Sequence, residues 1–308
     1  MKKVIFYIII LFMLFFSTVK AEETLNLDKK IIEFPSVENY SLQGFTVVKD
    51  NLFMVLNGYD DKVSKIIVYD LKNYNKIKEY DFGSLGHAND VTYNSKNNII
   101  YVLAGGGSNE VYLFNGTDFL YIDKLNLELP ARSITYIEDS DMYAIRTVAT
   151  GFKLDNELKL KSKVPFIFGM NIKSEVGRQG WSYYNGYIYY SNWSWIRLGG
   201  DGSNIIFIYD LNGSFVDTLY TKNDIGEIED IAFYNDTMIL GFNGYNDKIM
   251  FYELNVPEIF KEESYINDNM DESYEIETDI NYQMYYLSGL VIIVLVIILI
   301  IILRKKNK

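Results

Sequence analysis

Five pairs of polar or small residues stand directly before five apolar segments, and their types suit ligand binding or catalysis. Carboxylates and amides bind ligands through hydrogen bonds, and two carboxylates held together can act as general acid and base. The pairs recur along most of the chain, which indicates that one structural unit is repeated. They are Gln43 and Gly44, Asn89 and Asp90, Arg132 and Ser133, Gln179 and Gly180, and Glu229 and Asp230.

His87, the only histidine, lies two residues before Asn89. Imidazole titrates near neutral pH, so a general base acting with Glu229 or Asp230 is one interpretation and a structural hydrogen bond is the other. A zinc site built from several histidines is excluded, and a count of zero cysteines excludes thiolate ligands and disulfides.

Four carboxylates are candidate calcium ligands, because Ca²⁺ takes six to eight oxygen atoms. No calcium-loop motif accompanies them, and the alternative is a water-filled acidic channel with ion pairs to Arg132 and Arg178. No cofactor is certain from the sequence, and calcium is the only one that the residues suggest. The four are Asp90, Glu227, Glu229 and Asp230.

All three tryptophans, Trp181, Trp193 and Trp195, belong to the fourth repeat. A flat aromatic surface beside carboxylates and amides suits stacking on a sugar ring or binding a peptide. The alternative is that these rings pack against the neighbouring repeat.

The elements that position these residues follow from the repeat itself. Its units start at residues 44, 90, 133, 180 and 230, at intervals of 46, 43, 47 and 50. Each unit reads as alternating apolar residues, a turn and further apolar strands, and a spacing of ~40–50 residues is typical of a propeller blade. We predict an all-β fold, a five-bladed β-propeller with four-stranded blades; a β-sandwich or a six-bladed ring with one degenerate blade are the alternatives.

The fifth repeat stops near residue 254 after three strands, and residues 24–34 alternate like a strand. We therefore predict that this N-terminal strand closes the last blade and removes an open sheet edge. Antiparallel geometry brings the starts of the first strands and the turns between second and third strands to one face. That face is the predicted ligand site. Its candidates are Gln43, His87, Asn89, Asp90, Arg132, Gln179, Trp181, Trp193, Trp195, Glu229 and Asp230.

Both ends of the chain are hydrophobic. Residues 1–21 have the basic start, apolar run and small residues of an export signal, and residues 285–303 form a run long enough to span a membrane as a helix. The basic tail, residues 304–308, favours a cytoplasmic C-terminus. Residues 22–257 are then the extracellular propeller domain, and residues 258–284 form an acidic tether.

The formal net charge of −12 excludes nucleic acid as a partner, because phosphate binding needs a basic stripe. The predicted partners are the membrane, through the C-terminal helix, and an extracellular glycan, peptide or protein. The predicted location is the cell membrane, with one span, the propeller outside and the short C-terminal tail in the cytoplasm.

Residues 87–94, 100–102 and 208–213 resemble blade motifs of the YVTN/NHL group of bacterial and archaeal propellers. This resemblance covers most of residues 40–255. It implies blades and no particular chemistry.

Residues 42–45 (LQGF) and 179–181 (QGW) resemble two segments of the glutamine cyclotransferase family, whose fold is a five-bladed propeller. That family has an acid where Gln179 stands here, and its second acidic segment is replaced around residues 87–90. An amide cannot shuttle protons, so the resemblance implies the scaffold without the reaction.

These observations favour a membrane-anchored extracellular propeller that binds a glycan, peptide or partner protein on one face. One alternative is an extracellular enzyme of the cyclotransferase, lactonase or glycan-cleaving kind, with Glu229 or Asp230 acting beside His87. Another is a scaffold in envelope assembly.

Overall fold

The structure is a computed structural model, and all the residues that it describes lie in the unit formed by residues 1–264. The predicted export signal, tether, membrane helix and tail lie outside the described residues. In the part of the chain that is described, no helix has the length and apolar character needed to cross a membrane. The described residues are 24–25, 27, 29–35, 40–58, 62–88, 90–105, 107–147, 150–164, 176–194, 202–221, 225–245 and 248–257.

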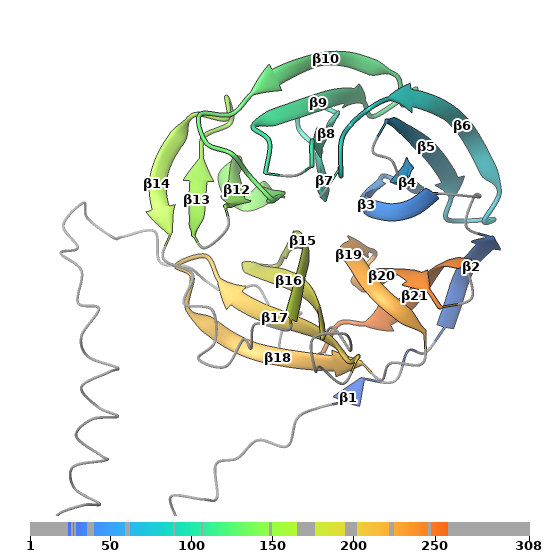
Figure 1. Cartoon of the computed structure of the whole chain (residues 1–308). Helices are drawn as coiled ribbons and strands as arrows, with labels where there is room; N and C mark the ends of the chain where they lie inside the picture. The colour runs from blue at the N-terminus through green and yellow to red at the C-terminus, as the bar shows by residue number, and fades with distance from the viewer. Residues whose placement is uncertain are drawn as a thin grey trace, which may run out of the picture. The chain divides into compact units, whose positions relative to one another are not determined.

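Five sheets stand around a central axis, each with four strands in antiparallel order, so the predicted five-bladed propeller is confirmed (Figure 1). Aromatic and β-branched residues dominate the strands, as expected for pleated sheets whose two faces both pack. Each blade runs from an inner strand beside the axis to an outer strand at the rim.

The first three blades are consecutive along the chain. Blade 1 is β3 (Tyr40–Val48), β4 (Asn51–Gly58), β5 (Val63–Asp70) and β6 (Lys76–Gly83). Blade 2 is β7 (Asp90–Asn94), β8 (Ile99–Leu103), β9 (Glu110–Asn115) and β10 (Tyr121–Asn126). Blade 3 is β11 (Ser133–Ile137), β12 (Met142–Arg146), β13 (Gly151–Leu154) and β14 (Leu160–Val164), with the 3₁₀ turn η1 (Glu138–Ser140) after β11.

The last two blades recruit the N-terminal segment. Blade 4 is β15 (Val176–Tyr184), β16 (Tyr187–Ser194), β17 (Asn204–Asp210) and β18 (Phe215–Thr221), with β1 (Thr24–Leu25) added outside β18. Blade 5 is β19 (Gly226–Tyr234), β20 (Thr237–Gly244), β21 (Lys248–Asn255) and β2 (Lys29–Pro35).

The ring closes as the sequence predicts, because β2 pairs antiparallel with β21. Lys29 bonds Glu253 across this seam at 3.2 Å, and Lys248 pairs with Glu33. The predicted closing strand is wrong in one detail, since β1 pairs in parallel with β18 of blade 4 and only β2 completes blade 5. The N-terminal segment therefore joins two blades.

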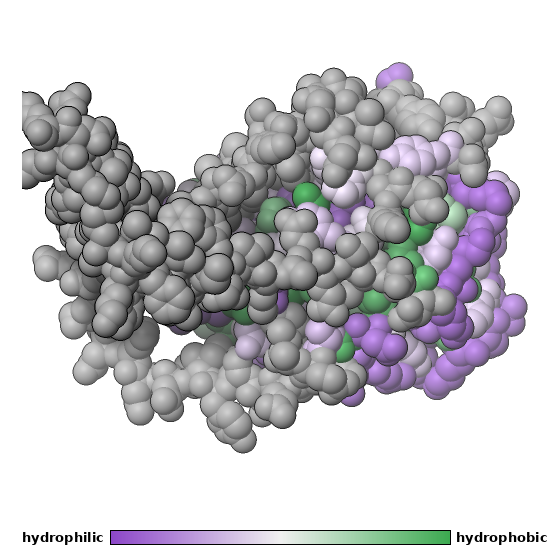
Figure 2. All heavy atoms as spheres, turned by 90° about the horizontal axis from the view of Figure 1, so that it is seen from below, coloured by the Kyte–Doolittle hydropathy of each residue, from purple (hydrophilic) through white to green (hydrophobic). Residues whose placement is uncertain are grey.

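Apolar side chains fill the spaces between neighbouring blades. The ring of Phe45 in blade 1 meets Phe251 of blade 5 edge-on at 5.0 Å, and Phe53 lies 5.6 Å from Phe114 of blade 2. Hydrophilic residues gather along the right-hand edge of Figure 2, on the side where β2 and β6 lie in Figure 1. The hydrophobic core therefore lies between neighbouring sheets, and both blades contribute side chains to each interface.

The five inner strands are of two kinds. Those of blades 1, 4 and 5 have nine residues each, whereas β7 and β11 have five. The three long strands share an irregularity in pairing with their neighbours, at Gln43, at Gln179 and Gly180, and at Glu229. A β-bulge of this kind redirects side chains, so these polar residues depart from the strict inward and outward alternation.

Candidate functional site

One residue from each inner strand forms a buried layer across the axis, and it is the second member of each polar pair noted in the sequence. The layer leaves room for acidic side chains because two of its members are glycines. A Cβ atom on Gly180 would lie 2.0 Å from Oδ1 of Asp230, and one on Gly44 would lie 3.1 Å from Cα of Asp90. The axial layer consists of Gly44, Asp90, Ser133, Gly180 and Asp230, all buried.

Asp90 ties three blades together. Its Oδ1 accepts the backbone N–H of Val91 at 2.9 Å, in its own blade. Its Oδ2 accepts the N–H of Ile134 in blade 3 at 2.9 Å and that of Trp181 in blade 4 at 3.1 Å. The side chain is fully buried, so these bonds replace the water that the carboxyl group has lost.

Asp230 does the same for the other two blades. Its Oδ2 accepts the N–H of Phe45 in blade 1 at 3.0 Å, and its Oδ1 accepts the N–H of Ile231 in blade 5 at 2.7 Å. Asp90 and Asp230 are also near enough to interact electrostatically, since the charge of Asp90 raises the pKa of Asp230. The two carboxyl groups thus link all five blades at the axis.

Both carboxyl groups hold protons more tightly than usual. Burial raises the pKa of Asp90 to about 7, with the Arg146 charge acting in the opposite direction. Burial also raises the pKa of Asp230, and the nearby charge of Asp90 raises it further. Two neighbouring buried carboxylates repel each other, so burial and this repulsion both favour the protonated form.

Arg146, which sequence reasoning missed, is the buried cation beside this layer. Its Nη2 donates to Oγ of Ser133 at 2.8 Å and to the carbonyl of Gln179 at 3.3 Å, and its guanidinium lies over the ring of Tyr190 at 4.9 Å. Its only signal in the sequence is a charge at the end of the apolar strand β12. The predicted cation, Arg132, is exposed instead, and the side chain of Arg178 is not described.

We call the end of the channel where the inner strands begin the strand-start end; its polar residues mostly bond one another. Gln179 donates through Nε2 to Glu227 at 2.7 Å, and Gln43 donates to Oγ of Ser41 at 2.8 Å. Burial and the charge of Glu227 raise the pKa of Glu229 well above its ordinary value.

Asn243 joins blades 5 and 1 at the strand-start end. Its Oδ1 accepts the N–H of Leu42 at 2.8 Å, while its Nδ2 donates to the carbonyl of Leu42 at 3.0 Å and to Oε1 of Glu229 at 2.6 Å. Asn57, which precedes Gly58 in blade 1 as Asn243 precedes Gly244 in blade 5, is also buried and accepts from Ser64. Both asparagines therefore bond within the fold.

The proposed catalytic constellation does not come together at an open site. His87 is exposed on the loop between blades 1 and 2, where its backbone packs over Gly105, whereas Asp90 and Asp230 are fully buried. Glu229 is 7% exposed and accepts from Asn243. Asn89 lies outside the described residues.

The predicted aromatic platform is wrong for Trp181, which is 1% exposed and packs in an apolar cluster with Ile137 and Ala144 of blade 3. Trp193 is half-buried, packs against the cluster between blades 4 and 5, and donates to the carbonyl of Gly202 at 3.2 Å. Trp195 lies outside the described residues. The two described rings thus pack against neighbouring blades, as the alternative interpretation predicted.

The arrangement of the described carboxyl groups does not support the predicted calcium site. Four oxygens of Asp90 and Asp230 already accept backbone N–H groups, and a cation would compete with those donors. Among the described residues, no group of three or more His, Cys, Asp or Glu side chains is arranged to hold a metal ion.

A pocket of about 300 Å³ lies at the other end, which we call the hairpin end because the inner strands turn there into the second strands. Each inner strand contributes the residue two positions after the axial layer, and these residues form the pocket floor. Side chains alternate along a strand, so the floor lies roughly 7 Å above the layer. The floor residues are Thr46, Thr92, Thr135, Ser182 and Ala232.

The floor is polar and the walls are aromatic. Thr92 accepts the N–H of Tyr136 at 2.9 Å, which fixes one hydroxyl group against blade 3. Tyr184 and Phe233 stack in the wall with their centroids 4.4 Å apart. Because the axial layer below is fully buried, the pocket is closed at its base. The aromatic lining residues are Tyr93, Tyr136, Tyr183, Tyr184, Phe233 and Tyr234.

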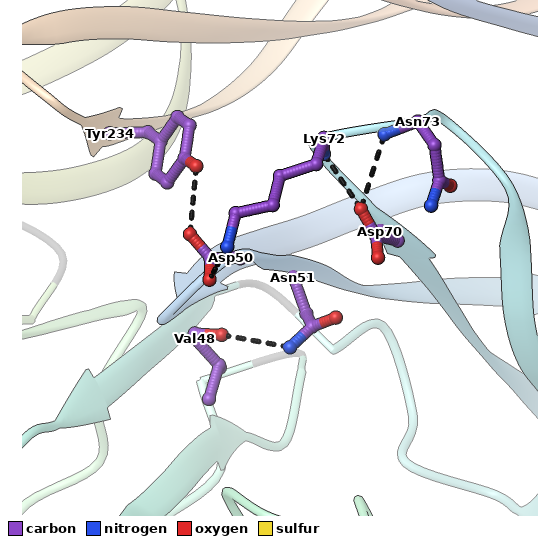
Figure 3. A network of polar contacts seen from close by, with 7 residues as sticks. All are labelled: Val48, Asp50, Asn51, Asp70, Lys72, Asn73 and Tyr234. Carbon is purple, nitrogen blue, oxygen red and sulfur yellow. Dashed lines mark hydrogen bonds and ion pairs between the residues drawn. The ribbon is translucent and has the colours of Figure 1, made fainter.

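Around this pocket, hydrogen bonds from hydroxyl groups of one blade to carboxylates of the next join neighbouring blades; we call each of them a clasp. Tyr234 of blade 5 donates to Oδ1 of Asp50 in blade 1 at 2.9 Å, and Lys72 pairs with the other oxygen of Asp50 at 2.5 Å (Figure 3). Asp70 holds the Lys72 turn by accepting its backbone N–H at 2.7 Å. Equivalent clasps are Ser95 to Glu138, Tyr183 to Asp139 and Tyr184 to Asp236.

Sequence reasoning missed this pocket entirely. Four of its five floor residues carry ordinary hydroxyl groups and the fifth is an alanine, all inside apolar strands, and no single one draws attention. The available signal was their recurrence: a Thr, Ser or Ala occupies the second position after every polar pair.

No known protein family matches the chain, and no curated protein matches it in sequence. Solved structures do match in fold. A protein of unknown function from Bacteroides caccae is 18% identical over 66% of this chain and 75% of its own, with a TM-score of 0.45. A member of the DUF4221 family from Bacteroides vulgatus is 11% identical over 76% and 98%, with a TM-score of 0.45.

A third match is the β-propeller domain of Cps50 (Swd1) from Myceliophteria thermophila. It is 10% identical over 75% of this chain and 100% of its own, with a TM-score of 0.42. These likenesses concern the fold alone. The resemblances to the YVTN/NHL group and to glutamine cyclotransferases stay predictions.

Proposed function

We propose that this protein is a ligand-binding β-propeller whose axial pocket takes a small polar group at the hairpin end. The observation that carries the proposal is a pocket of about 300 Å³ with hydroxyl groups from four blades at its floor and a buried layer closing its base. A concave, largely preformed site with a few convergent polar groups is what small-ligand binding requires.

We further propose that the propeller is exported and held at the cell membrane, with its ligand outside the cell. The support is the sequence pattern of residues 1–21 and 285–303, together with the acidic segment between the domain and the second run. A glycan, a peptide or a partner protein can each present a small polar group to the pocket.

Binding is better supported than catalysis. The enzymatic alternative needs His87 and a carboxyl group to face one open site, and Asp90 and Asp230 instead accept backbone N–H groups inside the axial layer. A binding role needs only the pocket.

The test is calorimetric melting of the full chain in a non-ionic detergent, with a panel of sugars, amines and carboxylic acids. A ligand that binds only the folded protein raises the melting temperature by mass action. Ser182→Phe places a ring on the pocket floor and should abolish any such shift. Ser162→Phe makes the same change at an exposed position of outer strand β14 and should leave the shift intact.

A compound that still raises the melting temperature of the Ser182→Phe variant binds elsewhere. If every shift in the panel survives, or if no compound produces one, the pocket is not the ligand site and the proposal is wrong. Thr46→Phe repeats the test from blade 1 in case Ser182→Phe folds poorly.

A further inference from the structure

We propose that the axial pocket binds an organic cation, in the form of an ammonium group carried by a small amine or by the lysine side chain of a partner protein. This inference rests on the proposed function and specifies its ligand. Three features of the pocket carry it: the sign of its charges, its aromatic walls and its acceptor-rich floor.

The charged residues that line the pocket all have the same sign. They are Glu138 and Asp236, and none of the lining residues is basic. Both carboxylates bond neutral hydroxyl groups, of Ser95 at 2.6 Å and Tyr184 at 2.6 Å, so their negative charge is not cancelled. A carboxylate or phosphate ligand would meet repulsion there, and a cation would meet attraction.

Two lysines in turns at the hairpin end pair with carboxylates that do not line the pocket. Lys72 pairs with Asp50 at 2.5 Å, and Lys96 pairs with Asp141 at 3.2 Å. Among the ion pairs between described residues, none involves Glu138 or Asp236. The lining therefore keeps an excess of negative charge at its mouth.

Aromatic rings favour the same kind of ligand. Six of the lining side chains are aromatic, and the face of such a ring attracts an ammonium group within about 6 Å of its centre. All five tyrosine hydroxyl groups of the lining are already held by neighbouring residues, those of Tyr93, Tyr136, Tyr183, Tyr184 and Tyr234. These bonds fix the rings in place before a ligand arrives.

The floor supplies acceptors. An ammonium group has three donors and no acceptor, which matches hydroxyl oxygens converging from several directions. Asp90 and Asp230 lie in the layer directly beneath Thr92 and Ala232, but burial raises the pKa of both carboxyl groups, so the negative charge of the site comes from Glu138 and Asp236. A volume of about 300 Å³ is at the small end for ligand pockets, so one amine or one side chain fills it.

The experiment is isothermal titration calorimetry on the full chain in a non-ionic detergent with three probes of equal length. They are 1,5-diaminopentane, 1,5-pentanediol and glutarate. We expect the diamine to bind at least tenfold more tightly than the diol, with no heat from glutarate. We expect its Kd to rise severalfold between 50 and 300 mM salt, because screening weakens exposed charge interactions.

Two variants locate the diamine. Ser182→Phe should abolish its binding, while Ser162→Phe should not. Asp236→Asn removes one charge of the lining and should raise the Kd about threefold to tenfold. Asp123→Asn, on the exposed outer strand β10, is the matched control and should leave the Kd unchanged.

A lysine-containing peptide separates the two sources of the cation. Binding at least tenfold tighter than the diamine identifies a partner's lysine, and equal binding identifies a free amine; both outcomes support the inference. If the diol or glutarate binds as tightly as the diamine and Ser182→Phe blocks it, the cation inference is overturned and the pocket proposal stands. If Ser182→Phe affects no probe, the cation inference is likewise overturned.

Discussion

The two ends of the channel use polar residues in opposite ways. At the strand-start end, Asn243 bonds both backbone groups of Leu42 and the carboxyl group of Glu229, and these residues are buried or half-buried. At the hairpin end, hydroxyl groups face a pocket of about 300 Å³. Conspicuous residue types thus hold the blades together, while the open site is made of common ones.

The axial layer lies between the two ends and explains the difference. Asp90 and Asp230 accept backbone N–H groups from all five inner strands, so we expect them to contribute strongly to the stability of the ring. Residues on the hairpin side of this layer are not needed to join the blades at the axis. Substitutions in the layer should therefore lower the free energy of unfolding strongly, and substitutions in the pocket should lower it little.

Asp90→Ala should have the largest effect. It leaves three backbone N–H groups buried without an acceptor, which we expect to lower the free energy of unfolding by about 4 kcal/mol or more. Chemical denaturation of the full chain measures it, with the exposed Asp123→Ala as the control. A loss below about 1 kcal/mol would mean that the layer does not hold the blades.

The second prediction concerns pH. Burial places the pKa of Asp90 at about 7 and raises that of Asp230, so these two groups bind more protons in the folded chain than in the unfolded chain once pH exceeds about 4. The stabilisation is complete below that pH and is lost as pH rises through about 7. Between pH 5 and pH 8 we expect stability to fall by roughly 2–4 kcal/mol.

Asp230→Asn should flatten this dependence. The amide keeps one acceptor, can donate to the carboxylate of Asp90 and carries no charge. The stability of the variant relative to the wild type should therefore increase as pH rises to 8. Denaturation curves at several pH values provide the measurement, and Asp123→Asn should retain the wild-type slope. Stability that rises from pH 5 to pH 8 would contradict the raised pKa values of Asp90 and Asp230.

The smallest expected effects compare the two ends directly. Asn243→Ala removes three hydrogen bonds at the strand-start end and should cost about 2 kcal/mol, whereas Ser182→Ala in the pocket should cost less than about 0.5 kcal/mol. Asn255→Ala, at the exposed end of β21, is the control for the asparagine change. Equal costs for Asn243→Ala and Ser182→Ala would remove the contrast between the ends.

Part of the site was readable from the sequence. The repeat starts at residues 44, 90, 133, 180 and 230 coincide with the axial layer, because the same inner-strand position recurs in each blade. The roles of the residues were not readable. Trp181 and Asp90 look like ligand-binding groups in isolation, and the structure buries both.

The sequence by itself determined the number of blades, their strands and the use of an N-terminal strand to close the ring, because apolar alternation and turn residues are local signals; it did not show that β1 pairs with blade 4. Tertiary structure alone decided which polar groups bond within the fold and which end of the channel holds a pocket. The reason is distance along the chain: the N–H groups that Asp90 binds belong to Ile134 and Trp181, 44 and 91 residues away. Only the closed ring brings those partners to one carboxyl group and leaves the hydroxyl groups above it free to line a pocket.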